Sequence, residues 1–354
     1  MKRIALSLLF FTLCLCLLPG RAALAASPGW ELLPEGWVYH EEDGSRRTGW
    51  LSWQGDWYYL DEQGVMQTGW VWSSPDWYWC GPSGRMVRNA GIDGWYIGKN
   101  GRMAGRAAPL GEADIAAVTA AAQWDGKPLG LYFEDLASGQ SLLLGGEERY
   151  YLASVLKAPY CMWVYTLADA GKADLSQTVR YDASMRHGGS GVVKDFASGT
   201  EIPVADLLEY AIRYSDNTAI DLLLSRFPFA DFKEFIVKEA GLTCPEGMET
   251  FSRTTLPLKD IAAMTKRVAA YLYSGAAHAD ALREDLLSTD YRCILAENNE
   301  IAQKYGYWEG WFHTTALVYG NRPYLLCICT APGSGIADTM PFYQVYYAVE
   351  MALR

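Results

Sequence analysis

Ser154 and Lys157 are the first pair of residues in this sequence whose types and spacing could support catalysis. Residues three positions apart lie on the same face of a helix, so the two side chains can meet if their segment is helical. A serine hydroxyl is a poor nucleophile without a base, and a lysine whose pKa is lowered by burial can act as that base. The same spacing also occurs on surface helices without this chemistry, so the pair alone does not establish an enzyme.

Two more short motifs, Ser215-Asp216-Asn217 and Lys304-Tyr305-Gly306, hold polar residues suited to proton transfer and substrate binding. Ser, Asp and Asn are also favoured at the N-termini of helices, so the first of these motifs could be an ordinary helix cap. The second could be a lysine in a surface loop. Each motif is weak by itself, and only the combination points to a function.

Taken in order, the three motifs resemble the S-x-x-K, S-D-N and K-[ST]-G motifs of the class A β-lactamases and penicillin-binding proteins. The flanking residues also resemble that family, and the resemblance spans nearly all of residues 110–354. The flanks that carry it are A-S-V-L-K-A-P at 153–159, S-D-N-T-A-I-D-L-L at 215–223, R-T-T-L-P at 253–257 and the segment 311–330. The resemblance implies an α+β domain of the β-lactamase/transpeptidase-like fold, with helices packed on an antiparallel sheet. It implies no cofactor and no metal.

The resemblance also implies a role for each matching side chain. Ser154 would attack an amide or β-lactam carbonyl, and Lys157 would accept its proton, directly or through water. Ser215 would pass a proton to the departing nitrogen, assisted by Lys304. Asn217 would hydrogen-bond the side-chain amide of the substrate.

The backbone N–H groups of Ser154 and Tyr307 would form the oxyanion hole, which stabilises the negative charge that develops on the substrate oxygen. Tyr305 and Gly306 would line the substrate-binding edge. Tyr305 departs from the family motif, because Thr or Ser normally stands there and its hydroxyl helps to hold the substrate carboxylate. The departure makes the choice of substrate an open question.

A second departure concerns deacylation. Class A enzymes carry an E-x-x-L-N signature whose glutamate activates the deacylating water, and no such signature stands between Asn217 and Arg253. Glu246 and Glu249 are acids in the corresponding loop, but neither has the expected neighbours. They could be solvated loop residues.

The elements that position these motifs can be predicted from hydrophobic period and turn residues. Predicted helices cover residues 112–123, 152–169, 204–226 and 342–353, and predicted strands cover residues 129–136, 141–144, 310–319 and 323–330. Strands near both ends with helices between them predict one antiparallel sheet closed by distant segments. Residues 105–109 read as a short linker in front of this domain.

Residues 30–105 form a repeat with a period of about 20 residues. Each unit has an aromatic strand, a glycine turn and a second short strand, which predicts a β-hairpin. A single hairpin is only marginally stable, so the units are expected to stack on one another. The aromatic strands begin at Trp37, Trp57, Trp77 and Trp95.

These repeats resemble the cell-wall-binding repeats of choline-binding and glucan-binding proteins, most clearly from Trp57 to Trp70. The resemblance implies aromatic cages between consecutive hairpins, one formed by Trp50, Trp57 and Trp77 and another by Trp70, Trp77 and Trp95. Such cages attract a quaternary ammonium through cation–π interaction, and the same faces could stack on sugars. The ligand would be a choline-bearing teichoic acid or a glucan; alternatively the array is only a spacer.

Residues 1–25 read as a signal peptide, with Lys2 and Arg3, an apolar run from Ile4 to Leu18, and small residues at Ala23-Leu24-Ala25. The run is short for a membrane span, although an uncleaved anchor is the alternative. No later stretch is apolar enough to cross a membrane. The sequence therefore predicts a secreted protein associated with the cell wall.

Net charge and cysteine spacing exclude other classes. The formal net charge is −11, and nucleic-acid binders are usually basic, so no nucleic-acid partner is expected. Six cysteines follow the signal segment without metal-site spacing, and they read mostly as buried small hydrophobic residues.

Three functions remain possible from the sequence. The leading hypothesis is a wall-associated serine acyl-enzyme hydrolase or transferase acting on D,D-peptide-type amide bonds, because the usual deacylating glutamate is missing. The first alternative is a true β-lactamase that uses Glu246 or Glu249. The second is a wall-binding protein whose hydrolase domain is inactive, which Tyr305 favours and the intact Ser154 and Lys157 oppose.

Overall fold

The computed structural model describes residues 28–354 except residues 297, 321 and 334–337. The expected signal peptide lies outside the described residues. The described chain divides into two compact units, one of residues 28–49 and 60–66 and the other of residues 50–59 and 67–354.

The repeats form short antiparallel β-hairpins, as their period predicts. The hairpins are β1 (Gly29–Leu33) with β2 (Gly36–His40), β3 (Gly49–Trp53) with β4 (Asp56–Leu60), β5 (Gly69–Ser73) with β6 (Asp76–Cys80), and the three-stranded β7 (Ala90–Ile92), β8 (Trp95–Ile97) and β9 (Met103–Arg106). In the second unit, Met86 N–H donates to Trp57 O at 2.7 Å, so one hairpin turn is bonded to the preceding aromatic strand.

A five-stranded antiparallel sheet lies at the centre of residues 110–354, with strand order β13-β12-β21-β20-β19. Its strands are β12 (Gly130–Asp135), β13 (Ser141–Leu144), β19 (Glu300–Trp308), β20 (Trp311–Tyr319) and β21 (Tyr324–Cys329). The strand pair from the beginning of the domain therefore joins the three strands from its end. This arrangement confirms the predicted sheet, and β19 is one of its two edges.

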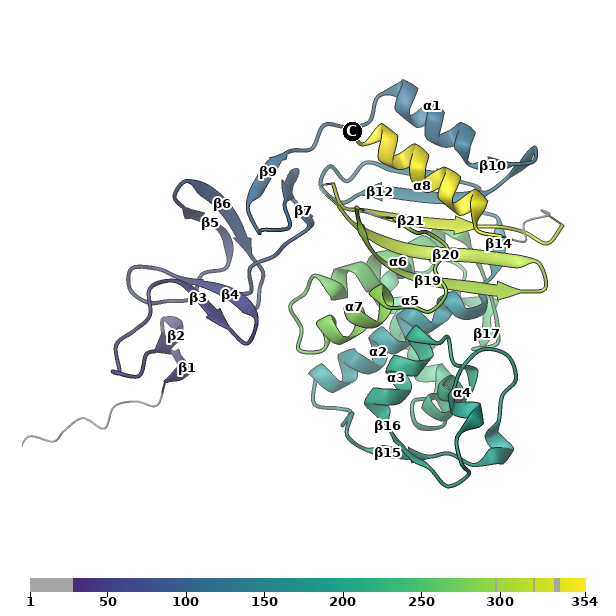
Figure 1. Ribbon diagram of the computed structural model, residues 1–354, viewed down its shortest axis with the longest axis horizontal. Coiled ribbons are helices and arrows are strands. Elements are labelled where there is room, and N and C mark those ends of the chain that lie inside the picture. Colours follow the sequence, from purple (N-terminus) through teal and green to yellow (C-terminus); the bar gives the residue numbers. More distant parts are fainter. Residues whose placement is uncertain (1–27, 297, 321, 334–337) are drawn as a thin grey trace, which may run out of the picture. The chain divides into compact units, whose positions relative to one another are not determined.

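Helices cover both faces of the sheet. Successive side chains of a strand point to opposite faces, and α1 (Glu112–Ala121) and α8 (Met340–Ala352) pack against Leu131, Phe133 and their neighbours on one face. Figure 1 shows these two helices side by side over the strands. The other face packs against α2 (Lys157–Asp169) and α6 (Leu258–Leu272). The predicted α+β fold is confirmed.

The remaining elements complete the helical part of the domain. They are α3 (Val204–Arg213), α4 (Asn217–Arg226), α5 (Phe229–Ala240), α7 (Ala279–Leu287), the three-stranded sheet of β14 (Arg149–Tyr151), β18 (Arg253–Pro257) and β17 (Met248–Thr250), and the pairs of β15 (Thr178–Arg180) with β16 (Glu201–Pro203) and β10 (Gln123–Trp124) with β11 (Lys127–Pro128). None of the helices in the described part of the chain combines the length and apolarity of a membrane span.

Two predicted elements differ from the structure. The predicted helix at 204–226 is broken into α3 and α4, because Ser215 has a φ of +51° and Asp216 caps the second helix. Residues 300–308, which the apolar pattern left outside any strand, form the long strand β19. Gln303 and Lys304 interrupt the apolar pattern there, yet both are buried.

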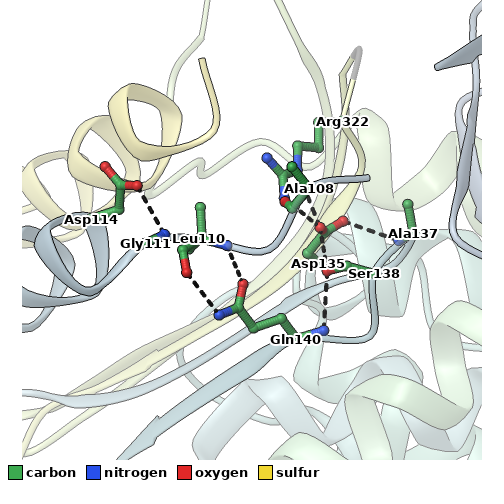
Figure 2. Close-up of polar contacts among 9 residues, drawn as sticks. All are labelled: Ala108, Leu110, Gly111, Asp114, Asp135, Ala137, Ser138, Gln140 and Arg322. Carbon is green, nitrogen blue, oxygen red and sulfur yellow. Dashed lines mark hydrogen bonds and ion pairs between the residues drawn. The ribbon is translucent and has the colours of Figure 1, made fainter. Parts of the chain in front are cut away.

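The linker before the domain is fixed to the sheet by polar contacts (Figure 2). Arg322 forms an ion pair with the fully buried carboxylate of Asp135 at 2.8 Å and also donates to Ala108 O. The side chain of Gln140 exchanges hydrogen bonds with the backbone of Leu110. Buried charges are stable only when paired, so these contacts order the segment that leads into α1.

The six cysteines of the described chain are free, and five of them are buried. Burial raises the pKa of Cys80 and Cys293 to about 12, so these thiols stay protonated. The interpretation of these cysteines as mostly small hydrophobic residues agrees with the structure.

Candidate active site

Ser154 lies in a 3-10 turn, Ala153–Leu156, that joins β14 to α2. Strand β14 pairs with β18, and Leu152 N–H extends the pairing by donating to Thr254 O at 3.0 Å. Ala153 then takes a φ of +46°, a strained conformation that turns the chain sharply just before Ser154. Residues three apart in a 3-10 turn are eclipsed, so Ser154 and Lys157 lie on the same side.

Lys157 connects the first motif to the second. Its side chain is only 2% exposed, and its Nζ donates to Ser215 O at 2.5 Å, Asn217 Oδ1 at 2.8 Å and Ser215 Oγ at 3.3 Å. Burial lowers the pKa of Lys157 to about 7, although the nearby carboxylate of Asp216 acts in the opposite direction. Close to neutral pH, this amine therefore has a substantial uncharged fraction.

Asp216 holds the second motif in place. Its buried carboxylate caps α4 by accepting from Ala219 N–H at 2.9 Å, and it also accepts from Val192 N–H at 2.6 Å and Val193 N–H at 2.8 Å. The cap interpretation is therefore correct for Asp216, while Ser215 and Asn217 on either side contact Lys157. The same three residues thus provide both a helix cap and the contacts to Lys157.

The glycine-rich segment before this motif packs directly against Asp216. Gly191 has a φ of +120°, and a Cβ atom there would lie 2.2 Å from Asp216 Cγ. Gly188 O accepts from Asn217 Nδ2 at 2.9 Å. At Gly191 the backbone can approach Asp216 this closely only without a side chain, and Gly188 places the same segment beside Asn217.

The third motif lies on the edge strand β19. Lys304 is 1% exposed, its Nζ donates to Tyr305 O at 3.3 Å, and it lies 4.4 Å from the centre of the Tyr305 ring. Burial, followed by the charge of Lys157, lowers the pKa of Lys304 well below its ordinary value. The two lysines are thus close enough to interact, and Lys157 provides the hydrogen bond to Ser215 Oγ.

Gly306 brings the edge strand into contact with the backbone at Ser154. A Cβ atom at this position would lie 2.9 Å from Ser154 N and 2.8 Å from Leu152 O. The backbone of β19 therefore runs directly beside the backbone N–H of Ser154, and the next residue along the strand is Tyr307. The side chain of Tyr307 is 57% exposed.

Tyr305 lies in an aromatic cluster. Its ring centre is 4.6 Å from that of Tyr291 and 4.4 Å from Lys304 Nζ. A threonine hydroxyl at this position would end close to the strand, whereas the phenol is carried away by its ring. The structure thus gives Tyr305 a packing role that Thr or Ser could not fill.

The loop acids lie apart from this constellation. Glu246 follows α5 in a 3-10 turn, and its carboxylate accepts from Arg149 at 2.6 Å; this hydrogen bond lowers the pKa of Glu246. Glu249 is an exposed residue of β17. Both acids therefore follow α5, Glu246 in the turn before β17 and Glu249 on β17 itself.

Two features were missed in the sequence. His313, on β20, is fully buried and contacts Tyr151 O, three residues before Ser154. His187 lies beside α4, with its Nδ1 2.7 Å from Asp221. A polar residue inside an otherwise apolar strand was the available signal for His313, and the glycine-rich run that follows His187 was the signal for the second.

The aromatic residues of the repeats contact one another in edge-to-face or tilted pairs. Trp50 lies 6.4 Å from Trp57 and 4.8 Å from Tyr78, whereas Trp70 pairs with Trp79 and Trp77 pairs with Trp72. Trp57 and Trp77 remain about 40% exposed. The structure therefore brings Trp50 and Trp57 together, and it places Trp95 on β8.

No group of His, Cys, Asp and Glu side chains in the described residues has the arrangement of a metal site. The polar groups gathered around Ser154 are instead a hydroxyl, an amide and two lysines. Such a set suits proton transfer and acyl transfer.

Two family models match the sequence. The "Beta-lactamase enzyme family" matches residues 112–340, and the "cell wall binding repeat" matches residues 48–66 and 68–86. A β-lactamase of Amycolatopsis lactamdurans is 37% identical over 102 residues, covering 29% of this chain and 32% of that protein. The extended-spectrum β-lactamase PER-1 of Pseudomonas aeruginosa is 35% identical over 88 residues, covering 24% of this chain and 28% of that protein. These matches span about a third or less of the curated relatives' length.

Solved structures share the fold over much more of the chain. The β-lactamase of Sphaerobacter thermophilus gives a TM-score of 0.60 at 20% identity and covers 69% of this chain and 98% of its own. The structure of PBP-A gives a TM-score of 0.59 at 21% identity, and the match covers 69% of this chain and 97% of the PBP-A chain. At this level of identity the comparison establishes the fold.

Proposed function

Because the chain belongs to the beta-lactamase enzyme family, we propose that it is an exported, wall-associated serine hydrolase that cleaves D,D-peptide-type amide bonds through an acyl-enzyme on Ser154. One observation carries this proposal. The buried Lys157, whose pKa is lowered to about 7, meets Ser215 and Asn217 one turn from the nucleophile.

Acylation would begin with neutral Lys157 accepting the proton of Ser154 Oγ as this oxygen forms a bond to the substrate carbonyl carbon. The negative charge on the substrate oxygen would be held by the backbone N–H groups of Ser154 and Tyr307. The close approach of Gly306 to Ser154 N supports this pairing of donors.

Collapse of the intermediate would break the bond to nitrogen. Ser215 Oγ would donate its proton to the departing nitrogen and recover one from the Lys157 ammonium, 3.3 Å away in the structure. Asn217 would orient the substrate amide, and Lys304 would add positive charge nearby when protonated. After this step Ser154 carries the acyl group and Lys157 is neutral again.

Substrate binding would use the edge of β19 at Tyr305 and Gly306. Because the Tyr305 ring packs against Tyr291, a substrate carboxylate would meet a different donor from the hydroxyl of the usual Thr or Ser. We therefore expect substrate preference to differ from that of enzymes with the K-T-G motif.

The missing E-x-x-L-N signature leads us to expect slow deacylation, which favours a D,D-peptidase over an efficient β-lactamase. Glu246 is held by Arg149, and Glu249 stands on an exposed strand, so neither acid is placed as the class A glutamate would be. The β-lactamase alternative rests on the names of the similar proteins, and it requires another base for water.

Intact-protein mass spectrometry after mixing with a penicillin, followed over time, tests the proposed chemistry. We expect an adduct that persists for minutes in the wild-type protein and is absent in Ser154→Ala. Ser225→Ala, which changes another serine of the same domain, should still form the adduct. Rapid loss of the adduct with release of product would establish a β-lactamase, and no adduct at all would establish an inactive domain.

We also propose that the repeats bind a wall polymer, either choline-bearing teichoic acid or a glucan. The exposed Trp57 beside Trp50 supports an aromatic binding face. The full chain should be retained on a choline resin and released by free choline, and Trp57→Ala should weaken retention while Tyr343→Ala, an exposed aromatic change on α8, should not. Retention on a glucan resin alone would select sugar stacking, and retention on neither would leave a spacer.

Export is the last part of the proposal. A signal peptide at residues 1–25 and the cell wall binding repeats support it. N-terminal sequencing of the protein recovered from the cell wall should begin close after Ala25, whereas recovery of the uncut chain from membranes would indicate an anchor.

A further inference from the structure

His313 is bonded to the segment that carries the nucleophile. It lies on β20, fully buried, and its Nε2 is 2.9 Å from Tyr151 O. Tyr151 is the last residue of β14, and the strained Ala153 and then Ser154 follow it. A hydrogen-bond donor at this point therefore fixes the backbone immediately before the turn that carries Ser154.

The two contacts of the His313 ring define its protonation state. Tyr151 O can only accept, so Nε2 must carry a hydrogen, and Thr330 N–H donates to Nδ1 at 3.3 Å, so Nδ1 must be free of one. Both contacts require the neutral ring with hydrogen on Nε2. Burial lowers the pKa of His313 to about 4, which agrees with this assignment.

Packing fixes the plane of the ring. Tyr150 lies edge-on at 5.6 Å, and Trp311 lies at 6.0 Å between ring centres. A ring held in this way presents its Nε2–H in a single direction. The donor is therefore part of a rigid support and not of a mobile side chain.

His313 also lies beneath the second half of the oxyanion hole. In the register of β19 and β20 it stands opposite Gly306, and Phe312 stands opposite Tyr307. Gly306 in turn contacts the backbone at Ser154 N. His313 thus belongs to the strand that pairs with β19, which carries Tyr307, and it is bonded to the segment that carries Ser154.

We propose that His313 is a positioning residue for the oxyanion hole: its Nε2–H holds Tyr151 O so that the N–H groups of Ser154 and Tyr307 stay aimed at one point. This inference rests on the proposed acyl-enzyme function. His313 touches no substrate and transfers no proton. It acts only through the backbone distance between the two donors.

The variants His313→Gln and His313→Asn separate this role from general packing. A glutamine amide reaches as far as His313 Nε2 and can donate to Tyr151 O. An asparagine amide reaches only the Nδ1 position, so it can keep the Thr330 contact but leaves Tyr151 O without its donor. The matched control is His278→Asn, the same substitution at a histidine elsewhere in the domain, whose Nδ1 lies 2.6 Å from Asp169 Oδ1.

The experiment measures penicillin acylation in the full-length protein, with the acylation rate constant separated from the dissociation constant of the initial complex. Misplaced oxyanion donors cost about 10- to 100-fold in rate, so His313→Asn should lose about that factor in the rate constant with an unchanged dissociation constant. His313→Gln should stay within about threefold of wild type, as should His278→Asn. Thermal unfolding midpoints establish that each variant is folded at the assay temperature.

Several outcomes would overturn the inference. A folded His313→Asn that acylates at the wild-type rate would do so, and so would equal losses in the Asn and Gln variants or a loss that appears only in the dissociation constant. If His313→Asn does not fold, His313→Met, an apolar side chain of similar length, is tested in its place with the same expectation. A wild-type protein that forms no adduct would refute the proposed function itself and this inference with it.

Discussion

Protonation of Lys157 should control the rate at which Ser154 is acylated. Burial of this lysine lowers its pKa from the ordinary 10.5 to about 7. At pH 7 roughly half of the Lys157 amines are then neutral, against roughly 0.03% of ordinary lysines, so the shift supplies a factor on the order of 10³ in available base. Only the neutral form can accept the Ser154 proton, so the rate must rise with pH.

The acylation rate constant, followed by quenched-flow mass spectrometry with a penicillin from about pH 5 to about pH 10, should increase about tenfold per pH unit below pH 6 and level off above about pH 8. Lys157→Ala should lose a factor of about 10² to 10⁴ and show no such rise. A rate that is independent of pH across this range, or one that rises only near pH 10, would refute the assignment of Lys157 as a base with a lowered pKa.

A charge change near Lys157 provides a matched test of the electrostatics. Asp221 raises the pKa of Lys157 through its charge, after the larger effects of burial, Asp216 and Cys161. Asp221→Asn should therefore move the midpoint of the rate profile to lower pH, and the shift should shrink in high salt. Asp195→Asn, another exposed acid of the same region, should leave the midpoint unchanged. A midpoint that moves upward in Asp221→Asn would contradict the sign.

Three more outcomes follow from contacts in the domain. Gly191→Ala should destabilise the fold by about 2–4 kcal/mol in urea unfolding, because the new Cβ would overlap the Asp216 carboxylate and the positive φ disfavours alanine. Glu246→Gln should leave the decay of the penicillin adduct nearly unchanged, because Glu246 is paired with Arg149; an adduct that persists much longer in this variant would identify Glu246 as the deacylating base. As the pH drops from about 6.5 to about 4, the unfolding free energy of wild type should fall by about 3 kcal/mol more than that of His313→Gln. The reason is that the imidazole is protonated in the unfolded chain but stays neutral when buried in the fold.

A specific experimental result would contradict each of these predictions. For Gly191→Ala it is an unfolding free energy equal to that of wild type. The His313 prediction is contradicted if the unfolding free energy of His313→Gln has the same pH dependence as that of wild type. The carboxylates that titrate in this range are common to both proteins, so they cannot produce a difference between them. The sign of the His313 effect follows from its lowered pKa, with full stability above about pH 6.5 and progressive loss down to about pH 4.

Local patterns predicted much of this protein. The three motifs indicated the family, and the period of about 20 residues indicated the hairpins, both of which are confirmed. The strand at residues 141–144 was predicted with its observed ends, and the last two strands were also found. These features depend on turn glycines, alternation of apolar residues and fixed spacing, which act over a few neighbouring positions.

These local patterns did not predict the break between α3 and α4 or the strand β19. The break between α3 and α4 needs the positive φ of Ser215 and the cap by Asp216, whose other partners Val192 and Val193 come from a separate loop. Strand β19 contains Gln303 and Lys304, polar residues that oppose an apolar strand pattern until their buried partners are known.

The chemical state of the site was decided by the tertiary structure alone. The pKa of Lys157 is lowered to about 7 because packing buries it against Ser215, 58 positions away, and the proposed role of His313 depends on Tyr151, 162 positions away. Residue types and spacing specify which groups the chain possesses. Desolvation and hydrogen bonding determine pKa values and the direction in which a hydrogen-bond donor points. Both arise only when distant segments come into contact.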